Sequence, residues 1–207
     1  MIEIPWFEDF SVGDEFNEVP SVTITDGYAA IHQSVFADRS PLFIDLPLCQ
    51  KVTGETRMLA NPALVCNIAI GQSTIPSQRV MGNLFYRGLH FKRPVFIGDT
   101  LTTRTKVIGL KQNTVKPGRA ASGMVALEIH VSNQKGETVL LFWRCPMIPC
   151  KNPDADTGLD DDFSIMPDAI TDNEIQSCLP SWDLTALTSR RIEYPVGEAI
   201  VVEARDT

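Results

Sequence analysis

The side chains that could move a proton are few in this sequence and lie far apart. The chain has three histidines, His32, His90 and His130, and Asp38 stands in an Asp-Arg-Ser-Pro segment that ends a helical pattern. Hydration or dehydration by general acid–base catalysis needs two such groups within hydrogen-bond reach of one substrate. Asp38 is the candidate acid, and its alternative role is a loop carboxylate that is solvated or paired with Arg39.

Each histidine also has a purely structural interpretation. His32 shares a helical face with Tyr28, which favours a half-buried imidazole with satisfied hydrogen bonds. His130 alternates with apolar strand residues and is expected on the polar side of a sheet. His90 also alternates with apolar neighbours, and it could reach a neighbouring pocket across a dimer.

Several catalytic classes are excluded by the absence of their motifs. No two histidines stand at metal-ligand spacing and no cysteine accompanies them, so we expect no metal site. Ser40, Ser73 and Ser77 lack the context of a nucleophile elbow, which argues against a serine hydrolase. The chain has no Gly-x-Gly-x-x-Gly motif and no P-loop, so we expect no nucleotide-binding fold.

Composition narrows the possible partners. Of the 207 residues, 43% are hydrophobic, which is enough for a packed core. The formal charge of −8 disfavours binding to the phosphate backbone of a nucleic acid. No stretch approaches the ~20 apolar residues of a membrane span, and the first residues do not resemble a signal peptide. The five cysteines form no Cys-x-x-Cys pair, so we expect reduced thiols in a cytoplasmic protein, with neither nucleic acid nor membrane as partner.

The element that must position any active group is an apolar segment at 61–73. Asn61 is a good helix N-cap, Pro62 suits the first helical position, and Gly71 is a natural stop. Almost no polar stripe interrupts the residues between them, so we expect a helix that is buried on nearly all sides. An antiparallel sheet should wrap around it.

The remaining elements follow from hydrophobic periodicity. Predicted strands occupy 15–25, 80–87, 89–95, 101–110, 125–132 and 138–148, with a hairpin turn at 133–136. A helix is predicted for 26–37, and 41–60 is expected to be an irregular loop that packs over other elements. Antiparallel hairpins around one buried helix indicate an α+β fold in a domain that covers residues 1–150.

The chain changes character after the last predicted strand. Residues 151–190 are polar and acidic and are predicted to form a linker with a short helix at 172–178. Residues 194–200 match 10–16 in character at a constant offset of 184 positions (194 − 10 = 184). Residues 191–207 are therefore interpreted as the partial start of a second copy of the domain.

The ordered motifs resemble the MaoC-like dehydratases, the (R)-specific enoyl-CoA hydratases with a hotdog fold. The resemblance covers roughly 5–150, and its segments are 7–14, 36–45, 61–73 and 94–108. Residues 98–113 look most like the two-hotdog branch that includes mesaconyl-CoA hydratase. The resemblance implies hydration or dehydration of an acyl-CoA thioester, no cofactor beyond the CoA of the substrate, and a thioester oxygen held at the N-terminus of the central helix.

The catalytic motif of that family is incomplete here. The family pattern Asp-x-Asn-Pro-Leu-His corresponds to Asp38, Ser40 in place of asparagine, and Phe43 in place of histidine. Phenylalanine cannot transfer a proton. The resemblance therefore implies that this half shapes the acyl pocket and that a second hotdog completes the chemistry.

Basic and polar residues after the central helix are the candidate substrate-binding groups. Arginine and lysine side chains suit the phosphates of CoA, although an ordinary solvated strand edge is the alternative. The candidate residues are Asn83, Tyr86, Arg87 and Arg93, with Arg79 and Lys92 in the same basic cluster.

Three functions remain open at this stage. The first is a half of an acyl-CoA hydratase or dehydratase that pairs as a homodimer or with a second hotdog. The second is a non-catalytic hotdog that binds acyl-CoA or supports a partner. The third is a hotdog thioesterase, in which Asp38 or Asp45 would activate water.

Overall fold

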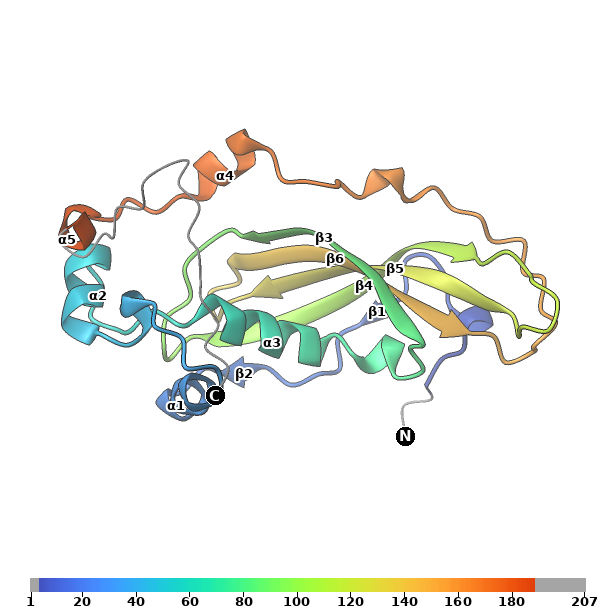
Figure 1. Cartoon of the computed structure of the whole chain (residues 1–207), viewed down its shortest axis with the longest axis horizontal. Coiled ribbons are helices and arrows are strands. Elements are labelled where there is room, and N and C mark those ends of the chain that lie inside the picture. The colour runs from blue at the N-terminus through green and yellow to red at the C-terminus, as the bar shows by residue number, and fades with distance from the viewer. Residues whose placement is uncertain (1–3, 189–207) are drawn as a thin grey trace, which may run out of the picture.

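An antiparallel sheet curves around one long helix in the computed structural model, which describes residues 4–188 (Figure 1). The sheet has six strands in the order β1-β4-β5-β6-β3, and β2 pairs with β4 as well. Their bounds are β1 Glu15–Phe16, β2 Val22–Thr23, β3 Gly82–Phe91, β4 Thr100–Gln112, β5 Ser122–Ser132 and β6 Thr138–Pro149. This is the predicted α+β hotdog architecture. The repeat predicted at 191–207 lies outside the described residues.

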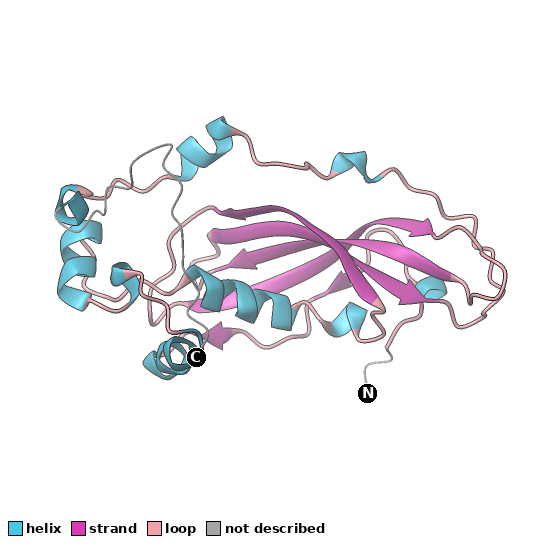
Figure 2. Cartoon of the chain, viewed as in Figure 1, coloured by secondary structure: helices cyan, strands magenta, loops and turns pink. Residues whose placement is uncertain are grey.

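Helices lie along one face and at one end of the sheet, and α4 lies beyond the other face (Figure 2). Their bounds are α1 Asp26–Phe36, α2 Leu46–Thr53, α3 Pro62–Gln72, α4 Asp172–Cys178 and α5 Thr185–Thr188. The helices predicted at 26–37, 61–73 and 172–178 correspond to α1, α3 and α4. None of the helices within 4–188 has the length and apolarity that crossing a bilayer requires.

Side chains of β4 alternate between the two faces of the sheet, as predicted. Thr103, Thr105 and Val107 turn inward and are at most 2% exposed, whereas Arg104 and Lys106 are exposed on the outer face. Strand β5 continues the same inner face with a row of fully buried aliphatic residues. This strict period is why β4 and β5 could be located from the sequence.

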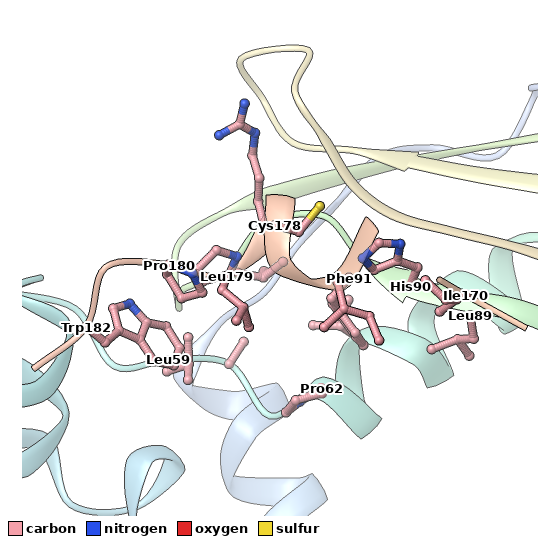
Figure 3. Close-up of a pocket in the computed structure, with 16 residues that line it drawn as sticks. Leu59, Pro62, Leu89, His90, Phe91, Ile170, Cys178, Leu179, Pro180 and Trp182 are labelled. Atoms are coloured by element: carbon pink, nitrogen blue, oxygen red, sulfur yellow. The ribbon is translucent and has the colours of Figure 1, made fainter. Parts of the chain in front are cut away.

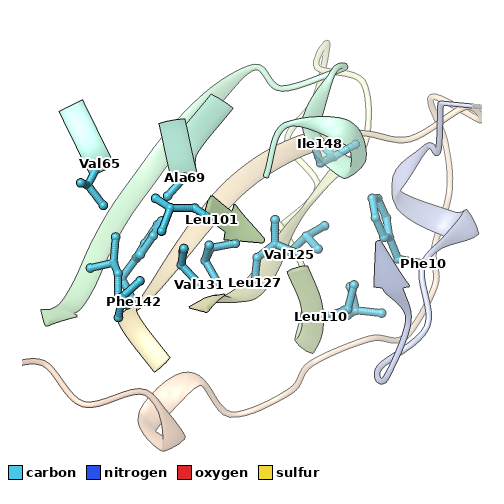
Figure 4. Packing of buried hydrophobic residues seen from close by; sticks show 14 of the residues in the cluster. Phe10, Val65, Ala69, Leu101, Leu110, Val125, Leu127, Val131, Phe142 and Ile148 are labelled. Carbon is cyan, nitrogen blue, oxygen red and sulfur yellow. The ribbon is translucent and has the colours of Figure 1, made fainter. Parts of the chain in front are cut away.

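The core fills the space between the inner face of the sheet and one side of α3 (Figure 4). Val65 and Ala69 of α3 have no exposed surface. They face a layer contributed by the strands, whose members include Leu101, Leu110, Val125, Leu127, Val131, Phe142 and Ile148. Burial of this apolar surface fixes α3 against the sheet and so sets the position of its N-terminus.

Three strand predictions need correction. The ranges 80–87 and 89–95 are one strand, β3, which bends at Gly88 (φ +57°) where its register against β6 shifts. A Cβ at Gly88 would lie 2.4 Å from the Trp143 ring, so the glycine permits both the backbone conformation and the close packing. The predicted strand at 15–25 is two short strands, β1 and β2, because only its ends pair with β4.

The range 41–60, predicted to be an irregular loop, contains helix α2. Asp45 caps it by accepting the Leu48 N–H at 3.1 Å, and Gly54 ends it in the left-handed region (φ +75°). Its buried residues Leu48, Cys49 and Val52 recur at helical spacing, but the helix is only eight residues long and gives a short signal. The Asp45 and Gly54 cap residues were the available signal.

Two helices leave apolar faces uncovered by the described residues. The predicted near-complete burial of α3 is wrong, because Pro62, Ala63, Asn67 and Gly71 are exposed and nothing within 4–188 covers them. The helix also continues one residue past Gly71. On α1, four apolar residues that recur at helical spacing are 45–69% exposed: Tyr28, Ile31, Val35 and Phe36.

Residues 160–182, called the strap below, cross the outer face of the sheet from β4 to β3. At the β4 end, Lys111 pairs with Asp160 at 2.5 Å, and the Phe163 ring packs over Gly109. At the β3 end, Asp168 binds Arg87 at 3.1 Å. The strap then continues through α4 to the N-terminal end of α3.

Candidate functional site

A hydrogen-bonded pair holds the N-terminus of α3. Asn61 Oδ1 accepts the Ala63 N–H at 2.8 Å, and Asn61 Nδ2 donates to Asp38 Oδ2 at 2.6 Å. Asp38 Oδ1 accepts the Ser40 N–H at 2.8 Å. The left-handed backbone of Ala37 (φ +49°) ends α1 and turns the chain so that Asp38 faces this cap.

These contacts keep the Asp38 carboxylate ionised. The Ser40 N–H and then the Asn61 amide lower the pKa of Asp38, because both donate to the charged form. A carboxylate with both oxygens already accepting hydrogen bonds orients the cap of α3. It has no proton to donate at neutral pH.

The first turn of α3 leaves one backbone donor unpaired. Pro62 has no N–H, the Ala63 N–H bonds to the Asn61 side chain, and the Val65 N–H bonds to the Asn61 carbonyl at 3.1 Å. The Leu64 N–H has no acceptor within residues 4–188. A free amide at the positive end of a helix dipole can bind a partly negative oxygen.

An apolar cavity of about 390 Å³ opens beside this helix end. Figure 3 shows Pro62 of α3 on one side, Leu89 and Phe91 of β3 on another, and Trp182 at the far end. Apart from His90, Arg93 and Cys178, the lining is apolar: Leu59, Ala60, Pro62, Val65, Leu89, Phe91, Pro94, Val95, Ile170, Ile175, Leu179, Pro180 and Trp182. The volume lies in the range of small-molecule sites, about 300–1,000 Å³.

The Asn61 cap can be tested by its contribution to stability. We expect Asn61→Ala to lower the free energy of unfolding by about 1 kcal/mol, because the Ala63 amide loses its acceptor. Asn61→Ser keeps a good cap but cannot span to Asp38, so it should lose less. Urea unfolding measures both variants. If both variants lose the same free energy of unfolding, the loss comes from the missing hydrogen bond to Asp38 and not from the missing helix cap.

Two curated bacterial proteins are similar to this chain. The β-methylmalyl-CoA dehydratase of Chloroflexus aurantiacus is 36% identical over 152 residues, which are 72% of this chain and 42% of that protein. The mesaconyl-CoA hydratase of Cereibacter sphaeroides is 29% identical over 145 residues, 69% of this chain and 40% of that protein. No protein-family model matches the chain.

Solved structures share its fold over most of its length. A Mycobacterium tuberculosis protein with a double hotdog fold superposes with a TM-score of 0.79 and 42% identity, covering 93% of this chain and 58% of that one. A protein from Chloroflexus aurantiacus described as a MaoC-domain dehydratase gives 0.78 and 30%, covering 94% and 56%. The chain is a MaoC-like hotdog protein. It spans about two fifths of the length of the two curated relatives.

In this MaoC-like protein, Phe43 lies apart from the apolar cavity. Its ring is half-buried against a small cluster of Cys49, Leu59 and Phe96, and it lines a second hollow beside α1. Asp38 and Phe43 are therefore held by different neighbours. Asp38 contacts the α3 cap, whereas Phe43 packs under α2.

Asn83 and Tyr86 meet a buried arginine that the sequence analysis missed. Arg144 is 2% exposed and lies opposite Tyr86 in the pairing of β6 with β3. Its guanidinium donates to Ser77 Oγ at 2.8 Å, to the Ser73 carbonyl and to Asn83 Oδ1 at 3.4 Å. Burial lowers the pKa of Arg144 and Tyr86 opposes this. Its contact with the carbonyl that caps α3 places the cation at the negative end of the helix. Arg144 alternates in register with the buried residues Leu140, Phe142 and Ile148 of β6, and this alternation was the sequence signal for its burial.

The predicted basic cluster is not one surface. Arg79 stacks over Trp6 before β3 begins, whereas Lys92 and Arg93 follow the end of β3, a strand roughly 30 Å long. Arg87 binds Asp168 of the strap. Arg93 therefore lines the cavity without Arg79, and the two do not form a joint phosphate site.

The three histidines occupy different surroundings. His32 is buried on α1, stacks on Phe36 with ring centroids 4.6 Å apart, and its Nε2 has no hydrogen-bond partner, so the predicted satisfied imidazole is wrong. His130 bonds to Thr138 Oγ1 at 2.8 Å on the outer side. His90 lines the cavity. Among residues 4–188 no three metal-ligating side chains gather in one place.

Proposed function

We propose that this chain is the thioester-binding half of an acyl-CoA hydratase or dehydratase. It would hold an enoyl-CoA or 3-hydroxyacyl-CoA, and a second hotdog would supply the acid–base pair. The observation that carries the proposal is the unpaired Leu64 amide in the first turn of α3, the turn whose Pro62 and Val65 line an apolar cavity. The names of the curated relatives, a dehydratase and a hydratase of CoA thioesters, agree with it.

The helix end matches the charge that develops in this reaction. Adding water across the double bond of an enoyl thioester, or removing it, moves negative charge onto the thioester oxygen. A backbone N–H and a helix dipole aimed at that oxygen stabilise the transition state more than the ground state. Leu64 supplies the amide, and the Asn61–Asp38 pair fixes its direction.

Neither Asp38 nor Phe43 can supply the proton transfers of this reaction. Asp38 is held ionised with both oxygens occupied, and Phe43 has no exchangeable proton. Water addition needs a base for the water and an acid at the neighbouring carbon. A second hotdog bearing both is therefore part of the proposal.

Uncovered surfaces support a partner of this kind. Strand β3 ends the sheet order, so its outer backbone edge has no partner strand among the described residues. Exposed apolar side chains lie along or beside it, namely Val80, Met81, Leu84, Tyr86 and Leu89. These side chains, and the exposed faces of α1 and α3, are surfaces that a second hotdog domain or a second copy of the chain would cover.

The test is a comparison of binding with turnover. We expect the purified chain to bind crotonyl-CoA without loss of the enoyl absorbance above the uncatalysed rate. We further expect butyryl-CoA to bind about fivefold more tightly than S-butyl-CoA, a thioether that lacks the carbonyl oxygen, because one hydrogen bond to the Leu64 amide is lost. Isothermal titration calorimetry measures both affinities.

Each alternative gives a different result. Release of free CoA from butyryl-CoA would show a thioesterase and reject the proposal. Hydration of crotonyl-CoA by the chain alone at enzymatic rates would reject the assignment of the acid–base pair to a partner. Equal binding of thioester and thioether would show that the helix end does not hold the oxygen.

A further inference from the structure

Part of the strap lies over the cavity beside α3 and is only loosely packed. This part, residues 168–181, includes α4 and is called the flap below. None of its residues is buried, and Ile175 and Leu179, which line the cavity, are 40% and 58% exposed. In Figure 3, Leu179 lies on one side of the cavity and Pro62 on the other. The position of the flap therefore controls access to the cavity.

The hydrogen bonds of the flap stay within it. The Ile175 N–H donates to the Thr171 carbonyl at 3.1 Å. The Thr171 N–H donates to Glu174 Oε2 at 2.9 Å, and the Ser177 hydroxyl donates to the Glu174 carbonyl at 2.8 Å. Within residues 4–188, no hydrogen bond joins the flap to the sheet or to α3. A segment with few buried contacts and only internal hydrogen bonds opens at a lower free energy than the core does.

Charged groups hold the flap against β3. Asp168 Oδ1 lies 3.1 Å from Arg87 Nε, and the Asp168 side chain is 85% exposed. The Thr171 N–H and hydroxyl lower the pKa of Glu174, and the charge of Lys92 acts in the same direction, so this carboxylate is also attracted to the end of β3. Exposed ion pairs contribute little to stability and weaken with salt. The flap is thus held by contacts that are easily broken.

Both ends of the flap are fixed to the folded core. Before the flap, Met166 is 1% exposed. After the flap, Trp182 packs against the cluster that contains Leu59. The Asp183 N–H then donates to the Val52 carbonyl of α2 at 2.9 Å. A segment that is fixed at both ends and weakly held between them can move outward while the sheet stays folded.

We propose that the flap is a lid on the cavity, latched by the Asp168–Arg87 ion pair, which opens to admit a ligand and closes over it. The closing step rests on the proposed function, since a thioester at the N-terminus of α3 would place apolar groups under the flap. Contact with those groups buries more of Ile175 and Leu179, which stabilises the closed position. A ligand shifts this equilibrium only as far as it binds the closed form more tightly than the open one.

Hydrogen exchange of the 207-residue protein, measured by mass spectrometry, reports the opening. We expect the amides of 168–181 to exchange at least about 100-fold faster than those of β5, and Asp168→Asn to accelerate them by a further factor of about three. Saturating butyryl-CoA should slow them by about fivefold relative to free CoA.

The matched control is Asp160→Asn, on the same strap but outside the flap. Asp160 also forms an exposed ion pair, with Lys111 at 2.5 Å, and its side chain is 77% exposed. Because this pair does not hold the flap, Asp160→Asn should leave the exchange at 168–181 unchanged.

The outcomes separate this inference from the proposed function. If the flap exchanges as slowly as β5, or if the two variants have the same effect on it, the latched lid is overturned. If calorimetry shows that butyryl-CoA binds but the exchange at 168–181 stays at its free-CoA rate, the closing step is overturned and the proposed function stands. If butyryl-CoA binds no more tightly than free CoA, the proposed function fails, and the exchange of the free chain and its two variants still decides whether a latched flap exists.

Discussion

Replacing Asp99 by alanine should lower the free energy of unfolding by about 3 kcal/mol. Its carboxylate is almost fully buried and accepts three hydrogen bonds: from the Phe96 N–H at 2.9 Å, from Arg57 at 2.7 Å and from Gln134 Nε2 at 3.0 Å. Alanine leaves these donors without an acceptor. The Asp99 backbone also bonds to Ile24, so the residue joins four segments at the start of β4.

The loss should depend on pH in a direction that the pKa fixes. Burial acts to raise the pKa of Asp99, but the hydrogen bonds from Phe96, Arg57 and Gln134 outweigh it, so the pKa lies below its ordinary value. The stabilisation is therefore complete above about pH 4, the unfolded-state value, and is lost as the pH falls through the lower folded-state value.

Urea unfolding of Asp99→Ala and Asp99→Asn at several pH values measures this effect. Asparagine can still accept from Phe96 but has no charge for Arg57, so its loss should be intermediate. The difference between wild type and Asp99→Asn should shrink below about pH 4. A difference that stays constant with pH would show that the charge of Asp99 contributes nothing.

The sequence located elements whose signals are local. The Asn61–Pro62 start of α3 and the Thr171–Glu174 capping pair of α4 each place the first turn of a helix by a few neighbouring residues. The alternation of β4 reflects its two faces in the same way. Such patterns act within one or two turns, so tertiary packing did not alter them.

Predictions that depended on what covers a surface went wrong. The apolar periods of α1 and α3 indicate surfaces to be buried, but they do not say by what, and the described residues cover only one side of each. Gly88 gave the same signal as a strand end, although the chain uses it as a bend within β3.

The site could be predicted only in part. Asp38 was found because its segment resembles a motif, and the structure adds that Asn61 is its partner. The cavity could not be predicted, because its wall depends on the course of the strap over the sheet. Trp182, a large apolar residue in a polar and acidic stretch, was the available hint.

The second large effect concerns Gly123, which packs against Phe7, the first residue of the opening motif at 7–14. A Cβ at Gly123 of β5 would lie 2.2 Å from two ring atoms of Phe7, which has no exposed surface. The ring cannot easily retreat, because Glu8 beside it accepts the Lys151 and Asn152 N–H groups at 3.0 and 3.1 Å. We expect Gly123→Ala to lower the free energy of unfolding by about 3 kcal/mol through overpacking.

A second glycine supplies the matched control. Gly71 lies in α3, and a methyl group added there would meet no atom within 4 Å, so Gly71→Ala should stabilise the helix by about 1 kcal/mol. The same chemical change then has opposite signs at the two sites. In Phe7→Ala the clash disappears, so adding Gly123→Ala to that background should cost less than about 1 kcal/mol. If Gly123→Ala costs the same with and without the Phe7 ring, the loss comes from the strand backbone, and the contact between the opening motif and β5 is not its cause.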